Sequence, residues 1–139
     1  MGLDQYAFSA NDENVNRQGI PEHSKTDQIA YWRKHNRLHG WMEKCWNEKG
    51  RPNATEPEGA NPYGSSFNCV PLEITAYDLD QLEGVVLDKK LPETGGFFFG
   101  SDSYELYEDF GFKKDDLDFI REARRLIGEG KRVFYDSSW

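Results

Sequence analysis

The chain has 139 residues, a formal net charge of −8, 14% aromatic residues and a mean hydropathy of −0.85. This length suits one compact domain over residues 1–139, with a small core built largely from aromatic side chains. The negative charge disfavours duplex nucleic acid as a partner, because duplex binding depends on neutralising phosphates. No apolar run reaches the roughly 18 residues that cross a bilayer, so no membrane partner is expected.

The cysteine content and the first residues of the chain indicate the cellular compartment in which the protein is expected. Two cysteines, Cys45 and Cys69, are too few for a disulfide framework and suit a reducing environment. The first residues, MGLDQYAF, contain neither the basic region nor the apolar region of a secretion signal. We therefore expect a cytoplasmic protein.

The first third of the chain predicts a strand, a loop and a long helix. Residues 3–9 alternate weakly and predict a short strand, and the polar residues 10–23 predict a loop. Residues 24–27, Ser-Lys-Thr-Asp, fit a capping box that would begin a helix. The expected helix extends from about Asp27 to Glu48, with apolar and basic side chains on opposite sides, and Gly50 would end it.

The rest of the chain predicts alternating short elements. They are a loop over 51–66, a strand over 67–74, a helix over 75–90 capped by Thr75 and Asp78, a strand over 96–101, a helix over 115–127 and a strand over 132–137. Strands and helices therefore alternate along the chain. This order predicts an α+β fold, or a small α/β fold, with a single layer of about four short strands packed by three helices.

The segment Tyr31–Trp46, YWRKHNRLHGWMEKCW, concentrates the chemistry of the chain. It holds three of the four tryptophans and two of the three histidines, and four basic residues against one acidic residue give it a charge of +3. Arginine can hold a phosphate with a bidentate fork, and a tryptophan face can stack on a base with about 1–3 kcal/mol. The segment could thus bind an anionic or planar ligand; a solvated helix face paired with carboxylates is the alternative interpretation.

Two further patterns are candidate sites. His35 and His39 have the spacing of a metal-binding pair, but they could equally close an aromatic core, and the chain has no CxxC or HExxH motif. No metal site is therefore predicted. In residues 95–101, GGFFFGS, alternation would place Phe98 on the opposite face of a strand from its two neighbours, so that one ring could line a pocket or an interface.

Motifs for catalysis fail on inspection. The sequence Gly128-Glu129-Gly130-Lys131-Arg132 lacks the upstream glycine and the hydroxyl residue of a phosphate-binding loop, and no nucleophile elbow surrounds a serine. The sequence therefore predicts no catalytic residue and no cofactor, and it favours a protein that is not an enzyme.

Five short blocks carry a resemblance to a known family. The blocks MGLDQYAF, YWRKHNRLHGW, Phe67-Asn68-Cys69, LPETGGFFFGS and SSW occur in this order and span nearly the whole chain. With these blocks the chain resembles a family of small phage proteins, including cyanophage members. Sequences of this family are often labelled phosphoglycerate kinase. That label does not fit a chain of this length without a phosphate loop. The family pattern includes His39 and leaves the positions of His35 and Arg37 open.

The resemblance and the residue patterns lead to one main hypothesis and two alternatives. The main hypothesis is a phage accessory protein that binds a small anionic ligand, such as a nucleotide, sequesters a host defence signal and forms homo-oligomers. The residues expected to contact the ligand are Trp32, Arg33, Lys34, Asn36, His39, Phe98 and Ser101. The alternatives are a protein–protein inhibitor of a host enzyme and a small metal-dependent hydrolase.

Overall fold

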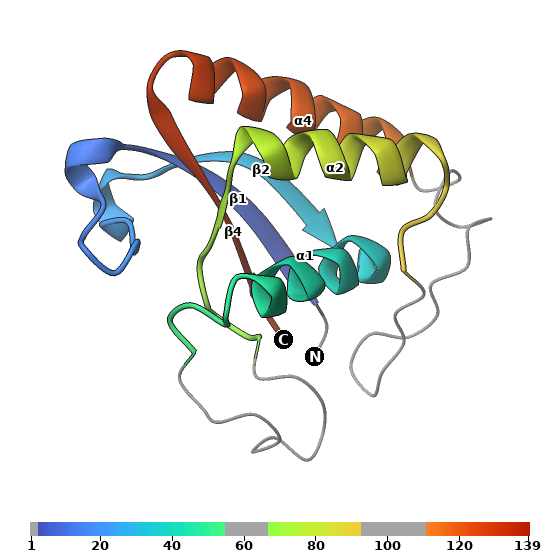
Figure 1. Ribbon diagram of the computed structural model, residues 1–139, viewed down its shortest axis with the longest axis horizontal. Coiled ribbons are helices and arrows are strands. Elements are labelled where there is room, and N and C mark those ends of the chain that lie inside the picture. Colours follow the sequence, from blue (N-terminus) through green and yellow to red (C-terminus); the bar gives the residue numbers. More distant parts are fainter. Residues whose placement is uncertain (1–2, 55–66, 93–110) are drawn as a thin grey trace.

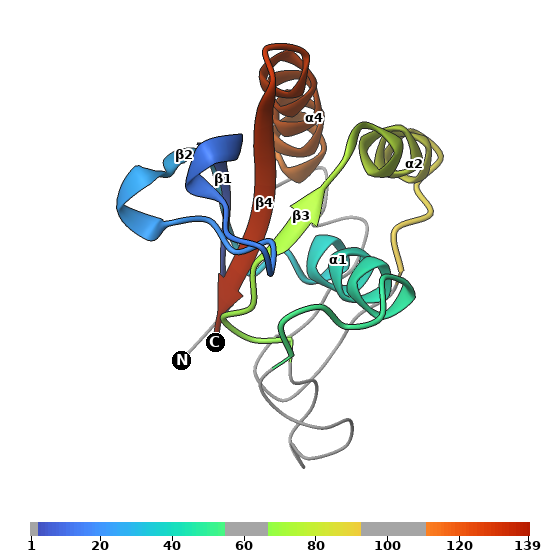
Figure 2. The same cartoon turned by 60° about the vertical axis from the view of Figure 1, so that its left-hand side comes forward.

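The structure, a computed structural model, describes residues 3–54, 67–92 and 111–139. Its strands are β1 (Asp4–Asn11), β2 (Asp27–Arg33), β3 (Leu72–Ile74) and β4 (Lys131–Ser138), and its helices are α1 (Asn36–Glu48), α2 (Ala76–Leu87) and α4 (Phe112–Gly128). The strands form one antiparallel sheet in the order β2-β1-β4-β3. These helices lie on one side of the sheet (Figures 1 and 2). The predicted α+β fold with one layer of four strands is confirmed.

The long helix predicted from Asp27 to Glu48 is wrong in its first half. Asp27–Arg33 is the edge strand β2, and the predicted capping box overlaps a single 3-10 turn at His23–Lys25. Strand β2 exists because it pairs with β1, where Trp32 lies opposite Gln5. The register of this pairing shifts between Ala7 and Phe8, because a β-bulge in β2 leaves Ile29 without a cross-strand partner in β1.

The Gln5 side chain of β1 determines where β2 ends and α1 begins. Lys34 adopts a left-handed backbone with φ of 56°, and its N–H donates to the carbonyl of Leu3 at 2.8 Å. The buried side-chain amide of Gln5 forms two hydrogen bonds with the backbone of His35. Its Oε1 accepts from the His35 N–H at 2.8 Å, and its Nε2 donates to the His35 carbonyl at 3.0 Å. These bonds satisfy the buried backbone as the chain leaves the sheet and begins a helix.

The other predicted elements match with shifted ends. Helix α2 ends at Leu87 rather than near 90, and α4 begins at Phe112 rather than 115. The strand predicted over 67–74 is reduced to β3, since Pro71 has no N–H to donate to a ladder. The strand predicted over 96–101 lies outside the described residues.

The capping box predicted at the start of α2 is confirmed. The Asp78 N–H donates to the Thr75 hydroxyl at 3.3 Å, and the Thr75 N–H donates to the Asp78 carboxylate at 2.9 Å. The Lys49 ammonium also donates to this carboxylate at 2.5 Å and lies close enough to form an ion pair. These bonds hold the pKa of Asp78 below its usual value despite the opposing effect of burial. The cap therefore joins the start of α2 to the end of α1.

We expect Thr75→Ala to lower the free energy of unfolding by about 1 kcal/mol, because an orphan helix N–H loses its acceptor. Urea unfolding would measure this loss. The matched control is Ser24→Ala, at the predicted capping box that does not cap a helix; this change should cost less than about 0.5 kcal/mol. Equal losses in the two variants would contradict the assignment of the cap.

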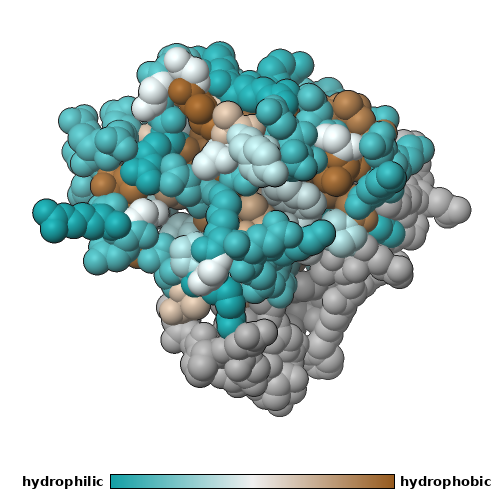
Figure 3. Space-filling model, in the orientation of Figure 1, coloured by the Kyte–Doolittle hydropathy of each residue, from teal (hydrophilic) through white to brown (hydrophobic). Residues whose placement is uncertain are grey.

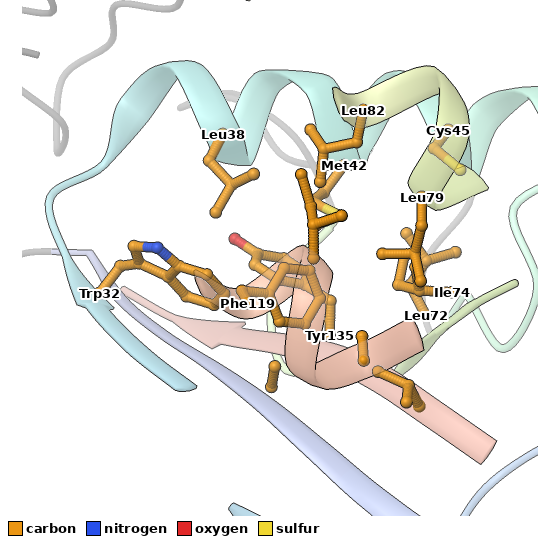
Figure 4. Packing of buried hydrophobic residues seen from close by; sticks show 14 of the residues in the cluster. Trp32, Leu38, Met42, Cys45, Leu72, Ile74, Leu79, Leu82, Phe119 and Tyr135 are labelled. Atoms are coloured by element: carbon orange, nitrogen blue, oxygen red, sulfur yellow. The ribbon is translucent and has the colours of Figure 1, made fainter. Parts of the chain in front are cut away.

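The core lies between the sheet and the helices (Figure 4). It is formed by Ala7, Trp32, Leu72, Ile74, Val133 and Tyr135 of the sheet, by Leu38, Met42, Cys45 and Trp46 of α1, by Leu79, Leu82 and Val86 of α2, and by Phe119, Ile120, Ala123 and Leu126 of α4. Hydrophilic residues predominate on the molecular face in Figure 3, where apolar residues form small separate areas. In the three described stretches, no helix combines the length and apolar character needed to cross a bilayer.

Candidate ligand-binding site

Strand alternation separates two of the residues predicted to contact a ligand. Trp32 faces the helices and is only 2% exposed; its Nε1–H donates to Asp116 at 3.0 Å. Arg33 lies on the outer face of the sheet, which we define as the side opposite α1, α2 and α4, and its side chain is 51% exposed. There its guanidinium donates to Asp4 at 2.7 Å. Trp32 and Arg33 therefore lie on opposite faces of the sheet.

The other predicted residues have different environments. Asn36 and His39 are buried in α1, whereas Lys34 is exposed at the β2–α1 junction. Phe98 and Ser101 lie outside the described residues. The structure does not gather the described members of the predicted set on one surface. Whether any of them contacts a ligand stays a prediction.

His39 lies among aromatic rings contributed by distant parts of the chain. Its Nδ1 is 2.8 Å from the Tyr135 hydroxyl, the Phe67 ring stacks on it with centroids 5.3 Å apart, and Trp139 meets it edge-on at 5.0 Å. Burial lowers the pKa of His39 to about 3, because charging the ring would require desolvation of the ion. The neutral imidazole is thus part of the core.

The other histidine of the pair with metal-ligand spacing, His35, has a different partner. The His35 Nε2 lies 2.8 Å and 3.1 Å from the two oxygens of Asp116, and its ring stacks on Phe112 with centroids 4.2 Å apart. Asp116 and His35 are both fully buried, and Trp32 donates to the same carboxylate. These contacts tie the β2–α1 junction to the first turns of α4. Within residues 3–54, 67–92 and 111–139, no three His, Cys, Asp or Glu side chains form a cluster that could hold a metal ion.

An open pocket of about 430 Å³ lies on the outer face of the sheet. This volume is within the roughly 300–1,000 Å³ of small-molecule sites. Its described lining residues are Tyr6, Phe8, His23, Thr26, Gln28, Cys69, Asp136 and Ser138. They come from β1, β2 and β4, from the loop that joins β1 to β2, and from the segment before β3. We call this site the outer-face pocket.

The sheet register explains why these side chains meet. Alternation along β1 places Tyr6 and Phe8 on the outer face, and Asp136 of β4 lies directly opposite Tyr6. The bulge in β2 brings Gln28 opposite Phe8, so that its side chain also reaches the outer face. The Tyr6 and Phe8 rings are 6.0 Å apart at an interplanar angle of 19°, and His23 meets Phe8 edge-on at 6.3 Å. The pocket therefore combines aromatic surface with polar groups.

Two groups in the pocket carry unusual chemistry. Burial raises the pKa of Asp136, although its Oδ1 accepts the Ser137 N–H at 2.7 Å. Cys69 has a left-handed backbone with φ of 58°, and its N–H donates to the Ser137 carbonyl at 2.7 Å. Burial and the neighbouring Asp136 raise the pKa of the Cys69 thiol. At neutral pH this thiol stays protonated, which makes it a poor nucleophile.

A second pocket, of about 390 Å³, lies between β2 and α4. Trp32 contributes to its lining, but three carboxylates, those of Asp115, Asp118 and Glu122, also line it, with Arg121 as the basic residue. Arg121 already donates to Asp118. The excess of negative charge makes this groove unfavourable for a phosphate.

The outer-face pocket was not found from the sequence. The alternation of Tyr6 and Phe8 in residues 3–9 was a usable signal, because it places two rings on one side of a strand. His23 and Asp136 are separated by 113 positions in the chain and belong to no common motif.

Comparison of the chain with protein-family models, with curated proteins and with solved structures found no match.

Proposed function

We propose that this protein binds a small ligand containing a planar heteroaromatic ring, with a nucleotide as the leading case, and that it does not act on it as an enzyme. The observation that carries the proposal is the outer-face pocket, where the Tyr6 and Phe8 rings adjoin hydrogen-bonding groups. Stacking of a base on an aromatic side chain is worth about 1–3 kcal/mol and needs no charge complementarity. The protonated Cys69 thiol supports binding over nucleophilic catalysis.

Arg33 gives this proposal a contact for a phosphate. It lies on the same outer face as the pocket, and a chain of contacts joins them: Tyr6 packs on Tyr31 with centroids 5.3 Å apart, and the Tyr31 hydroxyl and Arg33 both donate to Asp4. A guanidinium has five N–H donors, so the bond to Asp4 leaves others for a phosphate. The net charge of −8 opposes anion binding, and we therefore assign most of the affinity to the base.

The resemblance to phage proteins supplies the proposed setting. In the cytoplasm of a host cell, such a protein would act by sequestering a nucleotide signal of host defence. Self-association, expected from the sequence, would add copies of the pocket without changing its chemistry. The competing hypothesis, inhibition of a host enzyme through a protein–protein contact, predicts no saturable binding of any nucleotide.

Thermal unfolding with a panel of nucleosides and nucleotides tests the proposal. We expect at least one base to raise the unfolding temperature in a saturable manner, since a ligand that binds the folded state stabilises it. Tyr6→Leu should weaken that binding about tenfold, because the change removes a stacking ring but keeps an apolar side chain. The matched control is Tyr77→Leu on α2, where the tyrosine is 70% exposed and lies away from the pocket.

The outcomes are distinct. Loss of affinity in the Tyr6 variant alone supports the outer-face pocket, and tighter binding of a nucleotide than of its nucleoside supports a phosphate contact. The proposal is overturned if no compound shifts the unfolding temperature, or if the Tyr6 and Tyr77 variants lose affinity equally.

A further inference from the structure

Asp136 is the one described acidic side chain that lines the outer-face pocket. It lies on the outer side of β4, one of the two internal strands, opposite Tyr6 in the register with β1. One of its oxygens, Oδ1, accepts the N–H of the next residue, Ser137, at 2.7 Å. A carboxylate offers about four acceptor positions, so this bond leaves the group able to accept further donors from a ligand.

The surroundings of Asp136 favour a ligand that donates hydrogen bonds over one that only accepts them. Neither lysine nor arginine occurs among the described residues that line the pocket. Two titratable residues of the pocket lining interact electrostatically with Asp136: His23, from the loop between β1 and β2, and Cys69, from the segment before β3. Tyr135, buried on the other face of β4, interacts with it as well. Burial disfavours the charged form of this carboxyl, and the cost is offset when a ligand donates hydrogen bonds to it.

Building on the proposed function, we infer that the outer-face pocket selects a ring whose edge presents two adjacent N–H donors, as guanine does, through the Asp136 carboxylate. The N1–H and the 2-amino group of guanine lie side by side in the plane of the ring, and a carboxylate has two acceptor oxygens at a matching separation. Adenine presents one donor, its 6-amino group, beside the acceptor N1. N1 of adenine and a carboxylate oxygen are both acceptors and cannot form a hydrogen bond with each other. Adenine should therefore bind less tightly than guanine.

The pocket geometry is consistent with this assignment. Tyr6 and Phe8 offer ring surface next to the carboxylate, because Tyr6 is the cross-strand partner of Asp136. Gln28, Thr26 and Ser138 supply further side chains that can donate or accept at the pocket wall. A base that stacks on Tyr6 or Phe8 is thus in the same pocket as the Asp136 carboxylate, which would accept hydrogen bonds from the edge of the base.

Isothermal titration of guanosine, inosine and adenosine tests the inference. The wild-type protein should bind guanosine about tenfold more tightly than adenosine, and inosine, which lacks the 2-amino group, should fall between them. Asp136→Asn should reverse the preference toward adenosine, because an asparagine presents one acceptor and one donor. Its Oδ1 can still accept the Ser137 N–H, and a thermal unfolding curve close to that of the wild type would verify that the fold is kept.

The control variant is Asp88→Asn at the exposed end of α2, which should leave all three affinities unchanged. Equal binding of guanosine and adenosine by the wild type, or an Asp136→Asn protein that still prefers guanosine, overturns the inference but leaves the proposed function standing. If none of the nucleosides binds while a different planar compound does, this inference fails alone. If no planar compound binds, the proposed function and this inference fail together.

Discussion

Asp116→Ala is expected to lower the free energy of unfolding by about 3–5 kcal/mol, because each of two buried polar groups that loses this hydrogen-bond partner costs about 1–3 kcal/mol. The Asp116 carboxylate is fully buried and lies within hydrogen-bond distance of the Trp32 indole N–H and the His35 imidazole. Alanine would leave both of these buried groups without this acceptor and would open a cavity beside Phe112, on which the His35 ring stacks. Urea unfolding monitored by tryptophan fluorescence measures the loss.

Two matched variants make this prediction specific. Asp115→Ala removes the adjacent carboxylate, which is exposed on the same turn of α4, and should cost less than about 1 kcal/mol. Asp116→Asn keeps one acceptor oxygen and should give an intermediate loss. Similar losses for the Asp115 and Asp116 alanine variants would show that the buried contacts of Asp116 do not stabilise the fold.

Acidification from pH 7 to pH 5 is expected to destabilise the protein by about 2 kcal/mol through His39 alone. Burial lowers the pKa of His39 to about 3 in the folded state, whereas an exposed histidine in the unfolded chain titrates near 6.5. Between these values the unfolded chain binds more protons than the folded protein. Stability therefore falls as the pH decreases below about 6.5, and the loss from this group levels off below about 3.

The pH dependence of a His39→Gln variant isolates this contribution. Glutamine cannot titrate, so the variant should lose about 2 kcal/mol less stability than the wild type between pH 7 and pH 5, whatever its stability at pH 7. The lowered pKa of Asp78 affects stability in a more acidic range, because that carboxyl is ionised in both states above about pH 5. Parallel stability curves for the two proteins would refute a neutral, buried His39.

The two histidines show why the surroundings of residues 31–46 could not be predicted from the sequence. A spacing of four residues placed His35 and His39 on one helix face, but His35 precedes the first residue of α1 and binds a carboxylate of α4. His39 packs against Phe67 and Trp139, residues 28 and 100 positions away. The aromatic and basic character of residues 31–46 was real, but its division between core and outer face depended on contacts with distant elements.

Local sequence determined those elements whose stabilising contacts lie within a few residues. The Thr75–Asp78 capping box marked the start of α2, helical spacing marked α4, and the order of the segments indicated an α+β fold with about four strands. Tertiary structure alone decided that Asp27–Arg33 is a strand, because its hydrogen-bond partners belong to β1 and the Gln5 side chain fixes where it ends. The outer-face pocket likewise exists only after folding, since pairing of β1 with β4 brings Tyr6 and Asp136 together from opposite ends of the chain.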